Sequence, residues 1–282
     1  LTPVKRKKFM SQDSTIQGAL HSRPIFFKKN PEYLVVEQSL GLQGQVSLSG
    51  AKNAALVIIA SLVLTKGKST LFNIPASEDV LNMIQLMTDL GAHSVFDVQK
   101  NILEIDTTNL ESHSLSEETM VKTRASILVL GPLLARFGKA DVAFPGGDVI
   151  GERPIDYHLK NFQKMGVFFR EENGAIEATV DKLQHRNLLL EYPSVGATEN
   201  LVMAAVLTEG TTRIINAALE PEIFDFFEVL RKMGAQIEIE VPATIRITGV
   251  KVLKPIQHTI IFDRLEAGAL ILAGAMTGGY VH

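Results

Sequence analysis

The 282-residue chain contains no cysteine and no tryptophan, and aromatic residues make up only 6% of it. Without cysteine, the chain can form no disulfide, thiolate metal site or cysteine nucleophile, and this usage fits a reducing compartment. The longest apolar runs, such as residues 54–64, are too short to span a bilayer. We therefore expect a cytoplasmic protein with no membrane partner, held together by packing alone.

A large excess of charge of one sign is also missing. The net charge is −3, which gives no general electrostatic basis for binding nucleic acid. The basic run at residues 5–8 is local, and no apolar segment of signal-peptide length follows it. We expect residues 1–31 to be a disordered or non-native extension; a nucleic-acid-binding arm is the less favoured interpretation.

Familiar motifs for metals and nucleotides are absent as well. The seven histidines show neither HxxxH nor HxH spacing, and there is no GxGxxG or Walker sequence. The sequence therefore predicts no metal site and no cofactor.

Four segments rich in Ala, Leu, Val and Ile end in a glycine, at residues 53–67, 124–138, 198–210 and 265–278. The terminal glycines of these segments recur at a nearly constant spacing along the chain. Glycine after an apolar helical run is a C-cap signal, because the left-handed conformation costs it little. Since these helices are apolar nearly all round, we expect them to be buried.

A second repeated feature follows each of the first three glycines. A β-prone run (69–74, 140–144, 211–216) leads into an amphipathic helix, and a strand pair closes the unit (near 94–105, 168–180 and 236–247). One and the same offset relates Gly67 to Gly210, Asn73 to Asn216 and Gly91 to Gly234. Fixed-period similarity indicates one supersecondary unit copied several times. The prediction is an α/β fold built from repeated units of about 70 residues.

The repeats also suggest how the chain is organised. The fourth unit begins but has no strands after its helix, and strands are expected at residues 34–37 and 44–48, before the first unit. We expect one complete three-repeat domain at 52–260, flanked by parts of a split second domain at 32–51 and 261–282.

Two sets of polar residues are candidates for chemistry. Asp148 lies in the glycine-rich stretch 145–154, followed by Arg153, an arrangement suited to proton transfer; an ordinary surface turn is the alternative. Lys52 and Asn53 begin the first apolar helix, and Arg124 begins the second, close to the matching place in the repeat. A helix N-terminus with an added cation favours an anion, although a lysine at a helix end is common without a ligand.

Six ordered motifs carry a resemblance that covers residues 33–282. They are SGAKNAAL (49–56), TRAS (123–126), PGGDVIGERPID (145–156), PSVGATEN (193–200), NAALEPE (216–222) and DRLEAG (263–268). Together they resemble the UDP-N-acetylglucosamine 1-carboxyvinyltransferase family. The resemblance implies a two-domain enolpyruvyl transferase fold, an inside-out α/β barrel with the active site between the domains. It also implies that about a third of the family chain is missing and that these 282 residues alone are inactive.

The resemblance further implies a reaction and its residues. The enolpyruvyl group of phosphoenolpyruvate moves to the 3′-hydroxyl of UDP-N-acetylglucosamine, phosphate leaves, and no metal or organic cofactor is needed. This reaction begins peptidoglycan precursor synthesis, and so serves cell wall biogenesis, cell shape and cell division. Asp148 and Lys52 would be catalytic, and Lys52, Asn53 and Arg153 would bind phosphoenolpyruvate. The sugar nucleotide would meet Arg124, Arg153, Pro154, Ile155, Asp156, Tyr157, Tyr192, Pro193, Ser194 and Val195.

Asp148 stands where most members have the cysteine that fosfomycin alkylates, so we expect insensitivity to that antibiotic. The alternatives are an enolpyruvyl transferase with another acceptor, such as shikimate 3-phosphate, and a non-catalytic sugar-nucleotide-binding paralogue. The oligomeric state stays open.

Overall fold

The structure is a computed structural model that describes residues 29–30, 33–34, 41–112, 124–143, 155–172 and 175–282. It divides into two compact units, one formed by Ser49–Arg264 and the other by Leu1–Leu48 with Leu265–His282. Each unit is described by itself. The domain limits expected from the sequence at 31/32, 51/52 and 260/261 stay predictions.

The Ser49–Arg264 unit contains three copies of one order of elements: helix, strand, helix, strand pair. The first copy has α1 (Lys52–Ser61), η1 (Leu62–Leu64), β4 (Lys68–Phe72), α2 (Glu78–Asp89), β5 (His93–Asp97) and β6 (Ile102–Asp106). The second has η2 (Arg124–Val129), α4 (Leu130–Phe137), β7 (Lys139–Ala143), α5 (Asp156–Lys164), β8 (Phe168–Glu172) and β9 (Ala175–Thr179). The third has α6 (Val195–Ala205), β11 (Thr211–Ile215), α7 (Pro221–Met233), β12 (Gln236–Glu240) and β13 (Thr244–Thr248). The repeat predicted from the glycine spacing is confirmed.

Backbone conformation repeats together with the element order. Gly67, Gly138 and Gly210 all have positive φ, at 127°, 68° and 98°. Only Gly138 is the C-cap of its helix, as predicted. The caps expected at Gly67 and Gly210 are wrong, because η1 and α6 are capped by Thr65 and Val206 and these glycines lie in the turns that follow. Asn73 and Asn216 also share positive φ, at 60° and 59°. Their side-chain Nδ2 atoms donate to equivalent carbonyls, of Ile260 at 3.0 Å and of Leu190 at 2.9 Å. Asparagine suits this position because its short polar side chain tolerates the left-handed region.

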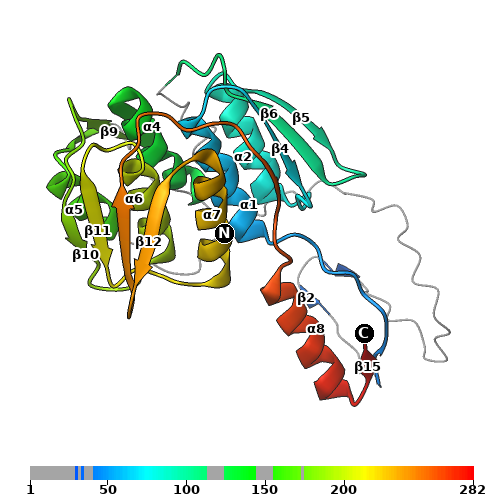
Figure 1. Ribbon diagram of the computed structural model, residues 1–282. Coiled ribbons are helices and arrows are strands. Elements are labelled where there is room, and N and C mark those ends of the chain that lie inside the picture. The colour runs from blue at the N-terminus through cyan, green and yellow to red at the C-terminus, as the bar shows by residue number, and fades with distance from the viewer. Residues whose placement is uncertain (1–28, 31–32, 35–40, 113–123, 144–154, 173–174) are drawn as a thin grey trace. The chain divides into compact units, whose positions relative to one another are not determined.

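The apolar helices α1 and α6 lie inside the unit, and the sheets lie outside them. In α1 every residue from Ala54 to Ser61 is buried, and in α6 every residue from Ala197 to Ala205. Figure 1 shows α1, α6 and α7 between the sheet that contains β4 and β6 and the sheet that contains β10 to β12. The expected burial is confirmed for these two helices.

Two short strands, one after the second repeat and one after the third, pair with a strand of another repeat. β10 (Asn187–Leu189) pairs in parallel with β11, at the edge of a sheet ordered β10-β11-β13-β12. β14 (Gln257–Thr259) follows the third repeat but pairs in parallel with β4 of the first, in a sheet ordered β14-β4-β6-β5. The second repeat supplies a sheet ordered β7-β9-β8. The chain after the third repeat therefore ties that repeat back to the first.

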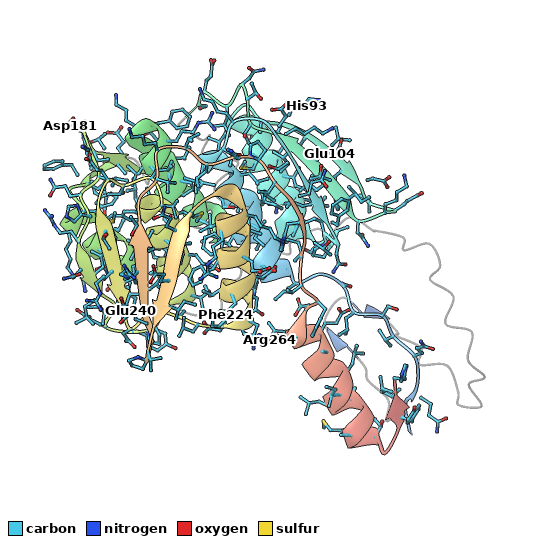
Figure 2. All side chains as sticks on the ribbon, in the orientation of Figure 1. His93, Glu104, Asp181, Phe224, Glu240 and Arg264 are labelled. Atoms are coloured by element: carbon cyan, nitrogen blue, oxygen red, sulfur yellow. The ribbon has the colours of Figure 1, made fainter. Side chains whose placement is uncertain are left out.

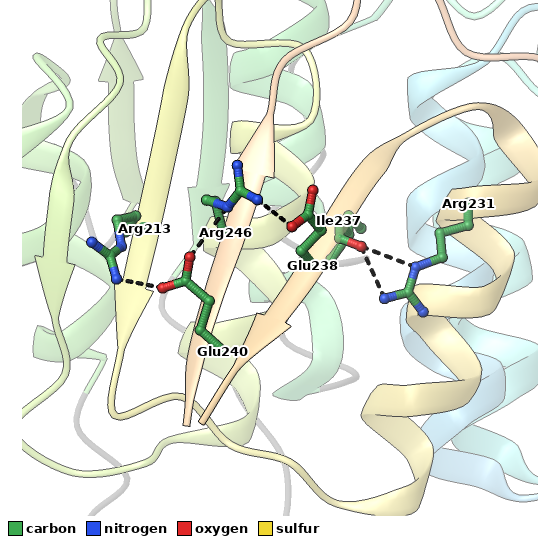
Figure 3. Close-up of polar contacts among 6 residues, drawn as sticks. All are labelled: Arg213, Arg231, Ile237, Glu238, Glu240 and Arg246. Atoms are coloured by element: carbon green, nitrogen blue, oxygen red, sulfur yellow. Dashed lines mark hydrogen bonds and ion pairs between the residues drawn. The ribbon is translucent and has the colours of Figure 1, made fainter. Parts of the chain in front are cut away.

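The outer face of the third sheet carries a row of alternating charges. Glu240 pairs with Arg213 on β11 and with Arg246 on β13, and Arg246 also pairs with Glu238 (Figure 3). On the other side of β12, the Arg231 guanidinium of α7 donates to the Ile237 carbonyl at 2.9 and 3.1 Å. These pairs neutralise like charges that would otherwise face each other across the strands.

The second unit contains the fourth apolar helix, α8 (Arg264–Thr277), and short strands. β15 (Tyr280–Val281) pairs in parallel with β3 (Gln43–Gly44), and β1 (Lys29–Asn30) pairs with β2 (Tyr33–Leu34). The strand expected at 44–48 is wrong in its bounds: β3 ends at Gly44, although the Val46 N–H still donates to the His282 carbonyl at 2.8 Å. Of the strand expected at 34–37, residues 35–37 lie outside the described part.

The expected burial of the fourth apolar helix is also wrong. Only Gly274 of α8 is buried, and Ile271 and Met276 are 69% and 85% exposed. Composition alone made α8 equivalent to α1, but burial also needs neighbouring elements, and within its unit α8 is contacted by the short segments at Gly41, Leu42 and Val281. Across the described ranges, no helix is long and apolar enough to cross a membrane.

Candidate active site

Three helices of the Ser49–Arg264 unit have their C-terminal ends gathered in one place. Arg136, in the last turn of α4, donates from Nη1 to the carbonyls of Val63 and Thr65 at 2.8 Å each, where η1 continues α1. A cavity of about 440 Å³ is lined by the ends of α4 (134–138) and of α6 (207–209), with residues 180–183. Since α1 packs on η2 and α4 packs on α6, their N-terminal ends point to the opposite end of the unit.

The starts of these helices carry a part of the predicted site. α1 begins at Lys52, η2 begins at Arg124, and α6 begins at Val195. Each helix N-terminus offers free backbone N–H groups and partial positive charge. The arrangement suits an anionic ligand, as the sequence predicted for Lys52 and Arg124.

Lys52 is fixed at the start of α1 by two carboxylates. Its backbone N–H donates to Asp263 Oδ2 at 3.4 Å, and its Nζ pairs with Asp79 Oδ2 at 2.7 Å. The first turn of α1 itself contains no acidic residue, so Lys52 adds its positive charge to the partial positive charge of the helix terminus. Both side chains of the Lys52–Asp79 pair are 43% exposed, which leaves the ammonium accessible.

Sequence reasoning missed Asp79. It lies in the first turn of α2, which Ser77 caps by accepting from the Val80 N–H at 3.4 Å. The cap was readable from the sequence, since serine precedes two acidic residues there. Nothing in the sequence spacing of the two residues indicated that Asp79 reaches Lys52.

Several predicted residues can be placed only in part or not at all. Asn53 is exposed in the first turn of α1. Arg124 is the first residue of η2, but its side chain lies outside the described part. Asp148, Arg153 and Pro154 also lie outside the described residues.

The start of α5 carries the next predicted residues. Ile155 and Tyr157 are partly buried and pack against the core. Asp156, in the first turn, pairs through Oδ2 with Lys160 at 3.1 Å. Its Oδ1 is buried and has no hydrogen-bond partner among the described residues, an arrangement that is costly unless another group satisfies it.

The last predicted segment precedes α6. Tyr192 is 62% exposed and Pro193 is exposed, whereas Val195 packs against the core. Ser194 is the N-cap of α6, and its Oγ accepts from the Ala197 N–H at 3.3 Å. Because this hydroxyl caps the helix, the exposed groups of the segment are the ones free to meet a ligand.

A second group of carboxylates surrounds the start of α7. Burial raises the pKa of Glu199 well above its usual value, and the nearby carboxylates of Glu220 and Glu222 add to the rise. Glu222 is buried and pairs with Arg264 Nε at 2.9 Å. Burial therefore favours the protonated form of Glu199, while Glu222 is paired with a cation. No set of three or more His, Cys, Asp or Glu side chains in the described ranges could hold a metal ion.

An apolar cavity of about 490 Å³ lies beside this group, and Phe224 and Arg264 line it. Figure 2 shows these two residues near the start of α7. The cavity includes none of the residues predicted for substrate binding.

Comparisons with known proteins identify the family. Residues 36–282 match the sequence profile described as EPSP synthase (3-phosphoshikimate 1-carboxyvinyltransferase). The chain is 48% identical over 247 residues to UDP-N-acetylglucosamine 1-carboxyvinyltransferase 1 of Caldanaerobacter subterraneus, covering 88% of this chain and 59% of that protein. It is 46% identical over 250 residues to UDP-N-acetylglucosamine 1-carboxyvinyltransferase 2 of Carboxydothermus hydrogenoformans, covering 89% and 59%.

Solved structures agree with the fold. The enolpyruvyl transferase NikO from Streptomyces tendae is similar with a TM-score of 0.75 and 24% identity, covering 83% of this chain and 55% of that one. EPSP synthase from Acinetobacter baumannii is similar with a TM-score of 0.66 and 17% identity, covering 83% and 53%. The chain spans about three fifths of the length of the curated relatives it matches. The predicted enolpyruvyl transferase fold is confirmed, and the chain belongs to the EPSP synthase (3-phosphoshikimate 1-carboxyvinyltransferase) family.

Proposed function

We propose that the protein transfers the enolpyruvyl group of phosphoenolpyruvate to the 3′-hydroxyl of UDP-N-acetylglucosamine and releases phosphate. This would be the first committed step of peptidoglycan precursor synthesis, in the cytoplasm. Support comes from the 45–48% identity to relatives that carry this enzyme's name. The observation that carries the proposal is Lys52, an accessible cation at the N-terminus of α1.

Phosphoenolpyruvate would bind at Lys52, Asn53 and Arg153. It carries a phosphate and a carboxylate, which fixed cations and helix N–H groups both position and stabilise. Asp79 holds the Lys52 ammonium in place before the substrate arrives. Because the Lys52–Asp79 pair is half exposed, it is weak enough for a phosphate to displace.

UDP-N-acetylglucosamine would bind along the other helix ends. The proposed residues come from three segments: Arg124 at the start of η2, 153–157 before and within α5, and 192–195 before α6. Tyr192 offers an exposed aromatic face, and Arg124 and Arg153 suit the diphosphate. The buried Oδ1 of Asp156 is an acceptor that a donor of the substrate or of the preceding segment could satisfy.

The proposed chemistry adds a proton before it removes phosphate. Asp148 would protonate the methylene carbon of phosphoenolpyruvate, which makes C2 electrophilic. The 3′-hydroxyl oxygen then bonds to C2 as its proton passes to a base. Cleavage of the bond between C2 and the phosphate oxygen, with loss of a proton from the methyl carbon, restores the double bond and releases phosphate.

Asp148 can act as an acid only if it holds a proton near neutral pH, although the reference pKa of aspartate is about 3.9. Burial and the ligand anions would raise its pKa, whereas Arg153 and Lys52 would lower it. The proposal requires the first pair of effects to prevail in the substrate complex.

An assay of the protein encoded by the complete gene tests the proposal. We expect phosphate release and an enolpyruvyl product with phosphoenolpyruvate and UDP-N-acetylglucosamine, and none with shikimate 3-phosphate as acceptor. Lys52→Ala should abolish turnover. If shikimate 3-phosphate is turned over and UDP-N-acetylglucosamine is not, shikimate 3-phosphate is the acceptor. If the protein binds the sugar nucleotide but turns over neither acceptor, its role is non-catalytic.

The aspartate at position 148 makes a pharmacological proposal testable. We expect no time-dependent inactivation of the wild-type enzyme by fosfomycin, because position 148 offers a carboxylate and no thiol to alkylate. Asp148→Cys should become sensitive. Inactivation of the wild type at the rate of this variant would contradict the role assigned to position 148.

A further inference from the structure

One buried side chain contacts all three secondary-structure elements that carry the proposed sugar-nucleotide residues. Asn200 lies in α6, which begins directly after the 192–195 segment. It is fully buried. Its amide bonds to η2 and α4, which follow Arg124, and to α5, which begins at Asp156.

The hydrogen bonds of Asn200 use both the oxygen and the nitrogen of its amide. Nδ2 donates to the Ile127 carbonyl of η2 at 2.6 Å and lies 3.1 Å from Nδ1 of His158 on α5. Oδ1 accepts from the Gly131 N–H of α4 at 2.5 Å. The reverse amide orientation would set Nδ2 against an N–H donor and Oδ1 against a carbonyl, so the network fixes the orientation.

His158 is built to be the acceptor in this network. Its ring is buried, and burial lowers its pKa to about 4, although the Asp156 carboxylate acts in the opposite direction. A neutral ring that accepts at Nδ1 carries its proton on Nε2. A Cβ at Gly196, in the first turn of α6, would lie 3.5 Å from Nε2, so the ring lies directly against the start of that helix.

Gly131 allows α4 to approach Asn200 this closely. A Cβ at position 131 would lie 2.2 Å from the Asn200 carbonyl oxygen and 2.5 Å from Oδ1. The backbones of α4 and α6 are therefore in contact at the point where the amide bonds. This leaves little freedom for one helix to shift against the other.

We propose that Asn200, with His158 as its acceptor, is a positioning residue that sets the spacing of η2, α5 and α6, at whose starts the described sugar-nucleotide residues lie. The inference rests on the proposed function, because the ligand it concerns is UDP-N-acetylglucosamine. Asn200 itself is buried below the helix ends and acts through η2, α5 and α6. A shift of about 1 Å between binding segments is enough to weaken a substrate complex strongly.

The test distinguishes an effect of Asn200 on ligand binding from an effect on the stability of the fold alone. Dissociation constants for UDP-N-acetylglucosamine are measured by calorimetry, and melting temperatures by circular dichroism, on the 282-residue chain and on the protein of the complete gene. The variants are Asn200→Ala, His158→Leu and His158→Asn. Asparagine presents an oxygen where His158 has Nδ1, so it can still accept from Asn200, whereas leucine cannot.

The control variant is Leu103→Ala, in the fully buried part of β6 and outside this network. We expect Asn200→Ala and His158→Leu to weaken binding about tenfold or more, at temperatures where both remain folded. His158→Asn should stay within about threefold of the wild type. Leu103→Ala should lower the melting temperature and leave the dissociation constant unchanged.

Three results would be decisive. Equal dissociation constants in the wild type, His158→Leu and Asn200→Ala would overturn the inference and leave the proposed function intact. Affinity that follows the melting temperature in all variants, Leu103→Ala included, would also overturn it. If the wild type binds no UDP-N-acetylglucosamine in either form, the proposed function fails and the inference fails with it.

Discussion

His158 should make the stability of the Ser49–Arg264 unit depend on pH between neutral and about 4. The folded protein buries the imidazole and lowers its pKa from 6.5 to about 4. The unfolded chain therefore binds a proton at this residue near pH 6.5, while the folded chain binds it only near pH 4. Since the unfolded state holds more protons in this window, stability falls as the pH falls through it.

The size of the effect follows from the two pKa values. Each pH unit between them is worth about 1.4 kcal/mol, so the difference between 6.5 and about 4 gives a loss of about 3 kcal/mol. The loss is complete below pH 4 and absent above pH 7. It is a large part of the stability of an ordinary domain, which is about 5–15 kcal/mol.

Urea denaturation from pH 4 to pH 7.5 measures this effect, with His158→Asn as the reference. Other groups titrate in the same range, so the quantity of interest is the difference between the two pH profiles. We expect the wild type to lose about 3 kcal/mol more than the variant on acidification. Parallel profiles, or an imidazole NMR titration of His158 near pH 6.5 in the folded protein, would refute the reasoning.

Three further predictions concern single positions. Glu199→Gln should stabilise the protein increasingly as the pH rises above about 4.5, and should change little below that pH. The reason is that the raised pKa of Glu199 makes the folded wild type lose stability as the pH rises, whereas glutamine does not ionise. Equal melting temperatures of both proteins at pH 8 would argue against this. Gly131→Ala should cost about 3 kcal/mol in denaturant titrations, since the added Cβ meets backbone atoms of Asn200; a cost below about 0.5 kcal/mol would mean that α4 can move freely. Glu240→Ala, which removes the centre of the exposed charge row, should cost less than about 1 kcal/mol. That cost should vanish in about 1 M salt, and a salt-independent loss would show that packing is responsible.

The repeat was predictable because it depends on local backbone requirements. Gly67, Gly138 and Gly210 adopt positive φ in the turns between the apolar helices and the strands that follow, and few other residues do so cheaply. Asn73 and Asn216 follow the same rule. Such positions are visible in the sequence because few residue types, glycine and asparagine above all, satisfy them.

Features that depend on distant parts of the chain were not predictable. β14, which follows the third repeat, pairs with β4 of the first, and neither strand's composition indicates its partner. The exposure of α8 was missed for the same reason, since its sequence is as apolar as that of α1. Periodicity tells which residues prefer burial, but not which elements are present to bury them.

In the candidate site, too, local features were predictable from the sequence and contacts between distant residues were not. The position of Lys52 at a helix start was readable from the sequence, because Gly50 precedes it and an alanine-rich apolar run follows it. Its partner Asp79 and the bonds of Asn200 were not, because they join side chains of elements that are far apart in the sequence.

The most direct test of the account is a mass-spectrometric assay of the complete gene's protein with phosphoenolpyruvate and UDP-N-acetylglucosamine. The account predicts enolpyruvyl-UDP-N-acetylglucosamine and one phosphate for each product formed, with loss of both in Lys52→Ala and Asp148→Ala. Product formation that survives either substitution at the wild-type rate would contradict the roles assigned here. So would the absence of any enolpyruvyl product from a folded wild-type protein.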